Sequence, residues 1–383
     1  MKILAIICEF NPFHNGHKYL LERAKKLSGA DFVLCIMSGC FTQRGEMCIL
    51  DKYTRAKHAI LGGADCVIQL PATFAVAPAE IFSTGAIKIL SSIPEVTTLA
   101  FGCESGDTQR FIDAAQMLSD ETDKFKSTLN EMLAGGESYI KSYASAFEEC
   151  GGNKSLVSNP NNILGLEYTK AILKANAKIE ILPVKRIGSE YNDEELKDNY
   201  SSASAIRKNI NCKEIENNLP EFVYSDLKNF KTGAGFDLIL KYSLFKAKAD
   251  DLKQIYGCGE GLENKLKSLA IMPVDKIIEN ATSKRYSSSR IRRILCANSL
   301  ELYQSDCEKY LNSELYIKPL AVKKQSADVI LSALSKSAFP TVTGIDTEKL
   351  NSTAKRCFEA DRKEFALYNF LTCSDKKDYM IIV

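Results

Sequence analysis

Apolar runs and amphipathic stretches alternate through the first part of the chain. Four runs are continuously apolar, which is typical of strands buried on both faces of a parallel sheet. They lie at residues 3–8, 32–37, 66–71 and 99–103. The stretches between them place apolar side chains on one helical face, at residues 18–27, 52–61 and 78–90. This alternation predicts an α/β fold with a Rossmann-like, doubly wound parallel sheet.

A more polar segment then interrupts the alternation. Residues 106–157 contain amphipathic helical patterns of high polarity, which predict an insertion or cover outside the sheet. The string Ser158-Asn159-Pro160 begins a further helix that continues to about Leu173. The apolar run at 179–184 follows as a fifth strand.

The parallel-strand pattern ends at about residue 212. Residues 213–298 are mainly helical in pattern, and residues 299–383 are mixed, with an apolar end that predicts a terminal strand at 379–383. We therefore predict an ATP-binding catalytic domain at 1–212 and a mainly α C-terminal region at 213–383.

Composition excludes some classes of protein and places the chain in a compartment. The formal net charge is +2, so a nucleic-acid site would have to be a local basic patch. The 13 cysteines form no CxxC pair, which predicts a reducing compartment, no disulfide scaffold and no bound structural metal. Because the first apolar run is short and begins at Ile3, we expect no signal peptide, no membrane partner and a cytoplasmic location.

The turn after the first strand carries the strongest candidate chemistry. Residues 9–17 read Glu-Phe-Asn-Pro-Phe-His-Asn-Gly-His, and they join a strand to a helix, where backbone N–H groups favour an anion. His14 and His17 are three residues apart and can face one ligand. Neutral or protonated, either ring would stabilise negative charge on a phosphate in the transition state. The alternative is that both histidines only cap or pack the helix.

A polar loop follows the second strand at residues 38–46. Ligands bind at the carboxyl ends of strands in open α/β sheets, so this loop is placed to contact one. Arg44, Lys52 and Arg55 are candidates for phosphate or carboxylate contacts, or are ordinary solvated charges, and residue types alone do not decide between these.

These strings resemble a known family. Asn11-Pro12-x-His14-x-Gly16-His17 resembles the HxGH signature of the nucleotidylyltransferase superfamily, and the longer form resembles one branch, the tRNA(Met) cytidine acetate ligases. Ser202-x-Ser204-x-Ile206-Arg207 is similar to the SSTxIR element, from which Ala203 and Ser204 depart while Ser204 keeps the hydroxyl. The resemblance covers most of the chain and is sharpest at 9–17, 38–55, 159–165, 186–207 and 282–295.

The resemblance implies roles for particular residues. It makes His14 and His17 catalytic. The ATP-binding residues that it implies are Ile7, Cys8, Glu9, Phe10, Asn11, Pro12, Phe13, His14, Asn15, Gly16, His17, Gly102, Asn162, Arg186, Ile187, Ser202, Ser204 and Arg207.

A second basic string lies far downstream, at residues 282–295. It holds five basic residues and no acid, and Tyr286 among them offers a face for a base to stack on, as expected for an RNA site. The alternative is a capped, solvated basic helix. The resemblance favours RNA, and the implied tRNA-binding residues are Lys284, Arg285, Tyr286, Arg290 and Arg293.

The function implied by the resemblance is an ATP-dependent ligase acting on RNA. ATP and acetate would give acetyl-adenylate and pyrophosphate, and the acetyl group would pass to N4 of the wobble cytidine of elongator tRNA(Met). Mg²⁺ is expected with the ATP phosphates. Two alternatives remain: a small-molecule adenylyltransferase, against which the basic string argues, and a non-catalytic RNA-binding module, against which His14, His17 and Arg207 argue.

Overall fold

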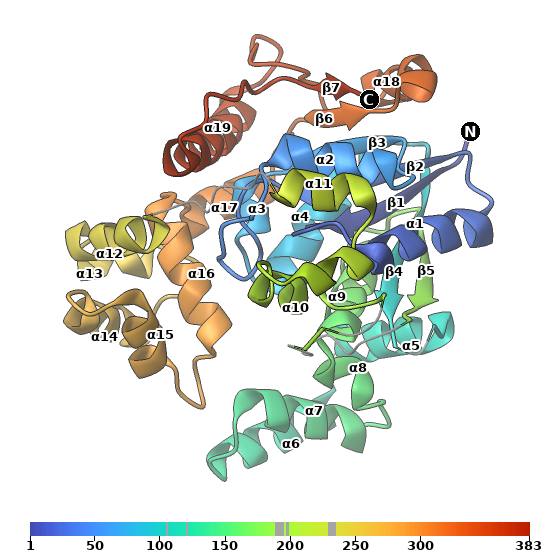
Figure 1. Cartoon of the computed structure of the whole chain (residues 1–383). Helices are drawn as coiled ribbons and strands as arrows, with labels where there is room; N and C mark the ends of the chain where they lie inside the picture. The colour runs from blue at the N-terminus through green and yellow to red at the C-terminus, as the bar shows by residue number, and fades with distance from the viewer. Residues whose placement is uncertain (105, 120–121, 188–194, 197–198, 229–234) are drawn as a thin grey trace.

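The computed structural model describes residues 1–104, 106–119, 122–187, 195–196, 199–228 and 235–383. Its centre is a seven-stranded sheet in the order β5-β4-β1-β2-β3-β6-β7 (Figure 1). The strands are β1 (Ile3–Cys8), β2 (Phe32–Ser38), β3 (Cys66–Leu70), β4 (Val96–Cys103), β5 (Glu180–Lys185), β6 (Pro319–Val322) and β7 (Ile381–Ile382). β1 to β5 are mutually parallel, as the apolar runs predict.

Helices cover both faces of this sheet, which confirms the doubly wound α/β prediction. Side chains alternate along β1: Leu4 and Ile6 pack with α1 (Asn15–Ser28) and α2 (Lys52–Leu61), whereas Ile3 and Ala5 pack on the other face. The helices that cover this second face include α4 (Ala79–Ser91), α5 (Thr108–Ser119) and α9 (Pro160–Lys174). A short helix, α3 (Ala72–Ala75), follows β3.

The helices formed by residues 123–149 lie away from the sheet. In Figure 1, α6 (Asp123–Ala134) and α7 (Tyr139–Glu149) pack against each other at the bottom, and α8 (Ser155–Ser158) leads back to α9. The chain after β5 forms α10 (Ala203–Lys208), a 3-10 turn at Lys213–Asn218 and α11 (Glu221–Lys228). Among the described residues, no helix is both long and apolar enough to cross a membrane.

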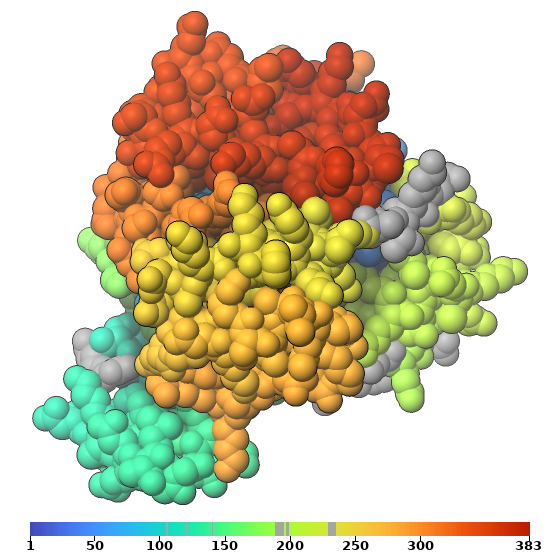
Figure 2. All heavy atoms as spheres, turned by 90° about the vertical axis from the view of Figure 1, so that its left-hand side faces the viewer, coloured from blue at the N-terminus to red at the C-terminus, as the bar shows by residue number. Residues whose placement is uncertain are grey.

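A helical unit follows and occupies the left of Figure 1. It consists of α12 (Phe236–Lys246), α13 (Ala249–Lys253), α14 (Leu262–Leu269), α15 (Val274–Ala281) and α16 (Ser288–Ser299). Figure 2 shows this unit filling the middle of one side of the molecule, between the red C-terminal region and the teal residues of α6 and α7. Helices in this part of the chain agree with the sequence pattern.

The end of the chain returns to the sheet. After α17 (Gln304–Leu311), β6 pairs antiparallel with β3, and after a 3-10 turn at Lys324–Ser326, α18 (Ala327–Ser335) and α19 (Ser352–Thr372), β7 pairs parallel with β6. The apolar terminus therefore forms a strand as expected, although a shorter one. The sequence pattern did not reveal β6, because it is only four residues long and begins with proline.

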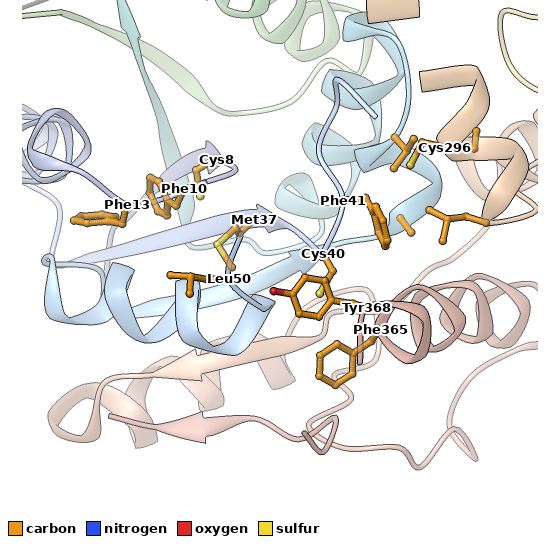
Figure 3. Packing of buried hydrophobic residues seen from close by; sticks show 14 of the residues in the cluster. Cys8, Phe10, Phe13, Met37, Cys40, Phe41, Leu50, Cys296, Phe365 and Tyr368 are labelled. Atoms are coloured by element: carbon orange, nitrogen blue, oxygen red, sulfur yellow. The ribbon is translucent and has the colours of Figure 1, made fainter. Parts of the chain in front are cut away.

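A buried carboxylate of α19, that of Glu364, holds the loop that follows β2. Oε1 of Glu364 accepts hydrogen bonds from the backbone N–H groups of Cys40 and Phe41, the latter at 3.1 Å. In Figure 3, Tyr368 and Phe365 of α19 lie next to Cys40 in the same place. This loop also borders the pocket described below, so the C-terminal helix helps to define the site's shape.

Replacing Glu364 by glutamine should change how stability depends on pH. Burial raises the pKa of Glu364 to about 7, with the charge of Lys52 opposing the shift and Asp361 adding to it. Between the unfolded value near 4.5 and about 7, the folded chain keeps a proton that the unfolded chain releases, so stability falls as pH rises through this window. Glutamine removes that loss. Relative to wild type, the variant should therefore gain stability between pH 5 and pH 8, by at most about 3 kcal/mol.

Thermal unfolding of both proteins at the two pH values tests this. A stability difference between variant and wild type that is the same at pH 5 and pH 8 would show that Glu364 is ionised throughout.

Candidate functional site

A pocket opens at the carboxyl ends of the central parallel strands. Its cavity volume is about 220 Å³. Its walls come from the β1–α1 turn, the loop after β2, the end of β4, the end of β5 and the start of α10. Lining residues that the sequence predicted are Ile7, Cys8, Glu9, Phe10, Asn11, His14, Gly16, His17, Gly102, Arg186, Ile187, Ser202, Ser204 and Arg207. Segments almost two hundred positions apart therefore meet in one place.

The β1–α1 turn fixes the two histidines by hydrogen bonds to the backbone. His14 is the N-cap of α1, and its Nδ1 accepts a hydrogen bond from the N–H of Gly16 at 3.1 Å. Nδ1 of His17 accepts one from the N–H of His14 at 3.3 Å. Gly16 has to lack a side chain here, because a Cβ would lie 2.9 Å from the His14 ring. The capping alternative and the catalytic role are thus compatible, because only Nδ1 of each ring is used for the hydrogen bond to the backbone.

Both rings are held neutral and can donate through Nε2. Because each Nδ1 accepts a backbone N–H, the proton of each neutral ring is assigned to Nε2. Burial lowers the pKa of His14 to about 3, with the charges of Arg186 and Arg207 adding to the shift. Burial also lowers the pKa of His17, and His14 and Arg186 lower it further. The rings stack with centroids 3.7 Å apart. The structure favours neutral hydrogen-bond donors over the protonated alternative.

Asn11 offers a further donor in the same pocket. Its Oδ1 accepts a hydrogen bond from the N–H of Ile49 at 2.9 Å. Its Nδ2 is buried and has no partner among the described residues, although Asn11 lines the pocket. A buried amide that lacks a partner is costly, and a bound ligand with an acceptor oxygen would satisfy it.

The loop after β2 is tied to both nucleotide motifs. The N–H of Gln43 donates to Oε1 of Glu9 at 2.6 Å, and Nη2 of Arg207 lies 3.0 Å from Oε2 of Glu46. The other terminal nitrogen of Arg207 donates to the carbonyl of Asn11 at 2.8 Å. Burial raises the pKa of Glu9, against the opposing hydrogen bond from Gln43. Glu9, Glu46 and Arg207 are therefore each held in place by a partner within the protein.

Sequence reasoning missed several lining residues. They are Thr42, Gln43, Glu46, Asn161, Lys185, Tyr200, Ser201 and Ala203. A usable signal existed for the first three, because the polar loop at 38–46 follows a strand's carboxyl end. The others flank predicted positions, and no residue type distinguishes them.

The three basic candidates, Arg44, Lys52 and Arg55, lie in different environments. Arg44 lines the pocket. Arg55 is fully buried, and its guanidinium donates to the carbonyls of Leu50, Glu9, Ser38 and Gly39. Lys52 is also fully buried, 2.7 Å from Oδ1 of Asp378. The contacts of Lys52 and Arg55 inside the protein therefore stabilise the fold, and these two side chains are not placed to bind a phosphate.

Four of the predicted ATP-binding residues do not line the pocket: Pro12, Phe13, Asn15 and Asn162. Phe13 is buried and packs on Phe10 and Phe222. Asn15 donates from Nδ2 to the carbonyls of Asn199 and Asn217, which fastens α1 to the later chain.

Asn162 is buried and does not line the pocket. It accepts from the N–H of Glu104 at 3.3 Å and donates to the carbonyl of Ser155 at 3.0 Å, so its amide is already engaged on both sides. Its neighbour Asn161 takes the place in the pocket. The string 159–162 therefore reaches the pocket through Asn161, and the predicted Asn162 does not line it.

The second signature begins α10. Oγ of Ser202, the N-cap, accepts from the N–H of Ala205 at 3.0 Å, and Oγ of Ser204 lies 3.4 Å from Nη2 of Arg207. Ile206 is fully buried, which anchors the helix and directs Arg207 towards the pocket. Residues 188–194 and 197–198, within the stretch that resembles the family, lie outside the described residues.

The side chains of the downstream basic string, residues 282–295, make more contacts within the protein than the composition of the string indicates. Tyr286 is 8% exposed, with the guanidinium carbons of Arg290 and Arg285 4.9 and 5.7 Å from its ring centroid. The open stacking face expected of Tyr286 is therefore not offered. Lys284 and Arg285 are exposed, and Arg285 pairs with Glu260 at 2.5 Å.

Two of the three later arginines of this string, Arg290 and Arg293, donate hydrogen bonds to backbone carbonyls. Nε of Arg290 donates to the carbonyl of Gly257 at 2.9 Å, and Nη1 of Arg293 donates to the carbonyl of Gln43 at 3.1 Å. Burial lowers the pKa of Arg293 to about 10. Arg293 thus holds the loop after β2, the same loop that borders the pocket.

The described residues contain no group of three or more histidine, cysteine, aspartate or glutamate side chains that could hold a metal ion. Within the pocket the carboxylates are those of Glu9 and Glu46, and both already accept from protein donors.

Comparisons with known proteins agree with this geometry. The family described as HIGH Nucleotidyl Transferase matches residues 1–380. The tRNA(Met) cytidine acetate ligase of Acetivibrio thermocellus is 35% identical over 93% of this chain and 90% of its own length. The protein of the same name from Clostridium perfringens is 33% identical over 100% of this chain and 98% of its own.

Solved structures give the same result. The crystal structure of Thermotoga maritima TmcAL in an apo form is similar over the whole of both chains, with a TM-score of 0.90 and 28% identity. A second crystal form of that protein, bound with alpha-thio ATP, has a TM-score of 0.88.

Proposed function

Because the chain belongs to the tRNA(Met) cytidine acetate ligases, within the HIGH nucleotidyl transferases, we propose that it acetylates elongator tRNA(Met) in two steps. ATP and acetate first give acetyl-adenylate and pyrophosphate, and N4 of the wobble cytidine then takes the acetyl group. The observation that carries this proposal is the pair of neutral histidines at the N-terminus of α1, both lining the pocket.

In the first step a carboxylate oxygen of acetate attacks the α-phosphorus of ATP. The bond between this phosphorus and the bridging oxygen breaks, and pyrophosphate leaves with the electron pair. Negative charge builds up on the phosphate oxygens, where the Nε2–H groups of His14 and His17 stabilise it without a proton transfer. Arg207, which lines the same pocket, would hold the departing phosphates.

In the second step N4 of the cytidine attacks the acyl carbon of acetyl-adenylate. The bond from that carbon to the phosphate oxygen breaks, AMP leaves, and N4 loses one proton to solvent or to the departing phosphate. The opening of the pocket must therefore admit a nucleotide base in addition to ATP. Single-stranded loops of RNA supply such accessible bases.

Mg²⁺ bound to the ATP phosphates fits this site better than a metal held by protein ligands. Glu9 and Glu46 are the carboxylates of the pocket, and both already accept hydrogen bonds from protein donors. Mg²⁺ commonly keeps several waters and takes substrate phosphates as ligands. It would neutralise phosphate charge there, while His14, His17 and Arg207 orient the same groups.

Pyrophosphate release from ATP tests the proposed function most directly. We expect release with acetate, slower release with butyrate, and almost none without a carboxylic acid. Release that depends on a phosphorylated small acceptor instead would favour the adenylyltransferase alternative. No release under any condition, together with tRNA binding, would favour a non-catalytic RNA-binding module.

Charge reversal at Lys284 and Arg285 should separate the two steps. Both side chains are exposed and make contacts at the surface, Lys284 with the carbonyl of Gly136 and Arg285 with Glu260. Arg290 and Arg293 are half-buried and donate to the carbonyls of Gly257 and Gln43, so their replacement would also disturb structure. If Lys284 and Arg285 contact RNA phosphates, the double glutamate variant should bind tRNA more weakly. Its salt dependence should be shallower by about 0.7–0.9 in log–log slope for each lost contact.

Acetate-dependent pyrophosphate release should stay near wild type in this variant. The matched control is Arg23→Glu with Lys26→Glu, an equal charge change on exposed positions of α1. Equal tRNA affinity of both double variants across a salt series would place the RNA site elsewhere.

A further inference from the structure

One helix of the C-terminal unit is apolar on two opposite faces. Leu240 and Leu244 of α12 are buried against the unit, where α12 packs on α16. Leu238, Tyr242 and Phe245 are 68%, 59% and 65% exposed. Their spacing of four and three residues puts them on one face, directly away from the buried pair. Single exposed apolar residues are ordinary, but three large ones in a row mark an interaction surface.

Positive charge borders this face on both sides. The helical spacing places Lys241 at one edge of this face and Lys246 at the other. Neither lysine has an ion-pair partner among the described residues. The only acid in the helix is Asp237, in its first turn. An aromatic strip between lysines is complementary to a nucleic-acid strand, whose bases stack on rings while its phosphates meet cations.

The position of α12 fits such a partner. It packs on α16, the helix that carries Arg290 and Arg292 of the basic string. Its N-terminal residue Phe236 contacts Phe41 of the loop after β2, with ring centroids 5.2 Å apart. In Figure 2 the yellow residues of this part of the chain lie at the outer surface of the molecule. A strand bound there would run beside the basic string, towards the elements that border the pocket.

We propose that the exposed face of α12, formed by Leu238, Tyr242 and Phe245 between Lys241 and Lys246, binds unpaired bases of the tRNA substrate. This inference rests on the proposed function and adds a surface to it. It also supplies the stacking face that Tyr286 does not offer, since that ring is buried and two arginines lie against it. The aromatic and basic components of the RNA site thus lie on adjacent helices of one unit.

Fluorescence anisotropy with an elongator tRNA(Met) transcript, across a salt series, tests the proposal. Tyr242→Ala with Phe245→Ala should weaken binding about tenfold for each base that loses its stacking partner. Tyr242→Phe keeps an aromatic face and should bind as wild type does. Lys241→Gln with Lys246→Gln should reduce the salt slope by about 0.7 for each lost phosphate contact.

The matched control is Tyr139→Ala on α7, because Tyr139 is 53% exposed and lies outside the C-terminal unit. It should leave tRNA affinity unchanged. Wild-type affinity of the double alanine variant at every salt concentration would overturn the proposal. Gel filtration with light scattering tests whether the face instead binds a second copy of the chain. A wild-type dimer that these substitutions dissociate, with tRNA affinity unchanged, would assign the face to that second copy.

Acetate-dependent pyrophosphate release by the wild type distinguishes the two levels of the argument. If it is absent, the proposed function fails whatever α12 binds. If it is present while the α12 variants bind tRNA normally, only the inference about this face fails.

Discussion

Replacing His14 or His17 by alanine is expected to lower acetate-dependent pyrophosphate release by about 10²–10³-fold, the usual loss when one transition-state donor is removed. ATP affinity should fall much less, because a donor aimed at developing charge matters most in the transition state. Each ring is fixed by a hydrogen bond from the backbone to Nδ1, so little freedom is lost when the reaction begins. Single-turnover pyrophosphate release and ATP binding should be measured on the same preparations.

The chain contains a matched control for this experiment. His58 is the third histidine, fully buried on α2 and 2.9 Å from Asp226, and it does not line the pocket. His58→Ala should reduce stability while folded protein keeps its pyrophosphate release. Glutamine at position 17 places an amide nitrogen near the former Nε2 and should retain more activity than asparagine. Near-normal release by the His14→Ala, His17→Ala double variant would remove the histidines from the mechanism.

The pH dependence follows from the same two rings. The pKa of His14 is lowered to about 3, and that of His17 is lowered as well, so the neutral donors persist as pH falls below the usual histidine value near 6.5. The rate of the first step should therefore show no histidine titration between pH 8 and pH 5. A rate that declines with an apparent pKa near 6.5 would mean that one ring gains a proton in the free enzyme.

Local sequence patterns were sufficient to predict the parallel sheet and the first motif. Continuous apolar runs identify strands that are covered on both sides, and β1 to β3 and most of β4 are such strands, whereas β5 is a half-buried strand at the edge of the sheet. The position of His14 and His17 after the first strand also follows from the sequence, because a strand-to-helix turn fixes them within a few residues. The resemblance then extended this to Arg207, whose approach to the turn is a tertiary contact.

The contacts that satisfy buried charged and polar side chains could not be predicted from the sequence. Lys52 looks like a surface cation at the start of a predicted helix, but Asp378, more than three hundred residues later, neutralises it in the core. Arg55 is satisfied by backbone carbonyls, which no residue pattern records. Tyr286 appears exposed among basic neighbours, yet two of these neighbours cover its ring. For Lys52 and Arg55 the partner that decides the role is distant in sequence or is backbone, whereas for Tyr286 it is the conformation of two nearby arginines.

Replacing Arg207 by glutamine should lower pyrophosphate release by about 10²-fold or more. Its guanidinium contacts the carbonyl of Asn11 at 2.8 Å and Glu46 at 3.0 Å, so one side chain links the second signature to the first turn and to the loop after β2. Lysine should restore little, because a single ammonium cannot reproduce two diverging contacts. Lys208→Gln, the same charge change one residue later on α10, should have almost no effect, since Lys208 does not line the pocket.

A Glu46→Gln variant tells whether Arg207 acts on ATP or only on the fold. It removes the ion pair but leaves the arginine and its contact with Asn11 in place. If Arg207 binds phosphates, releasing it from Glu46 should preserve or strengthen ATP binding while Arg207→Gln weakens it. If Arg207 serves only to fasten the loop after β2, both substitutions should weaken ATP binding alike and lower the unfolding temperature together. Opposite effects of the two variants on ATP affinity would therefore assign Arg207 to the nucleotide, whereas parallel effects would assign it to the scaffold.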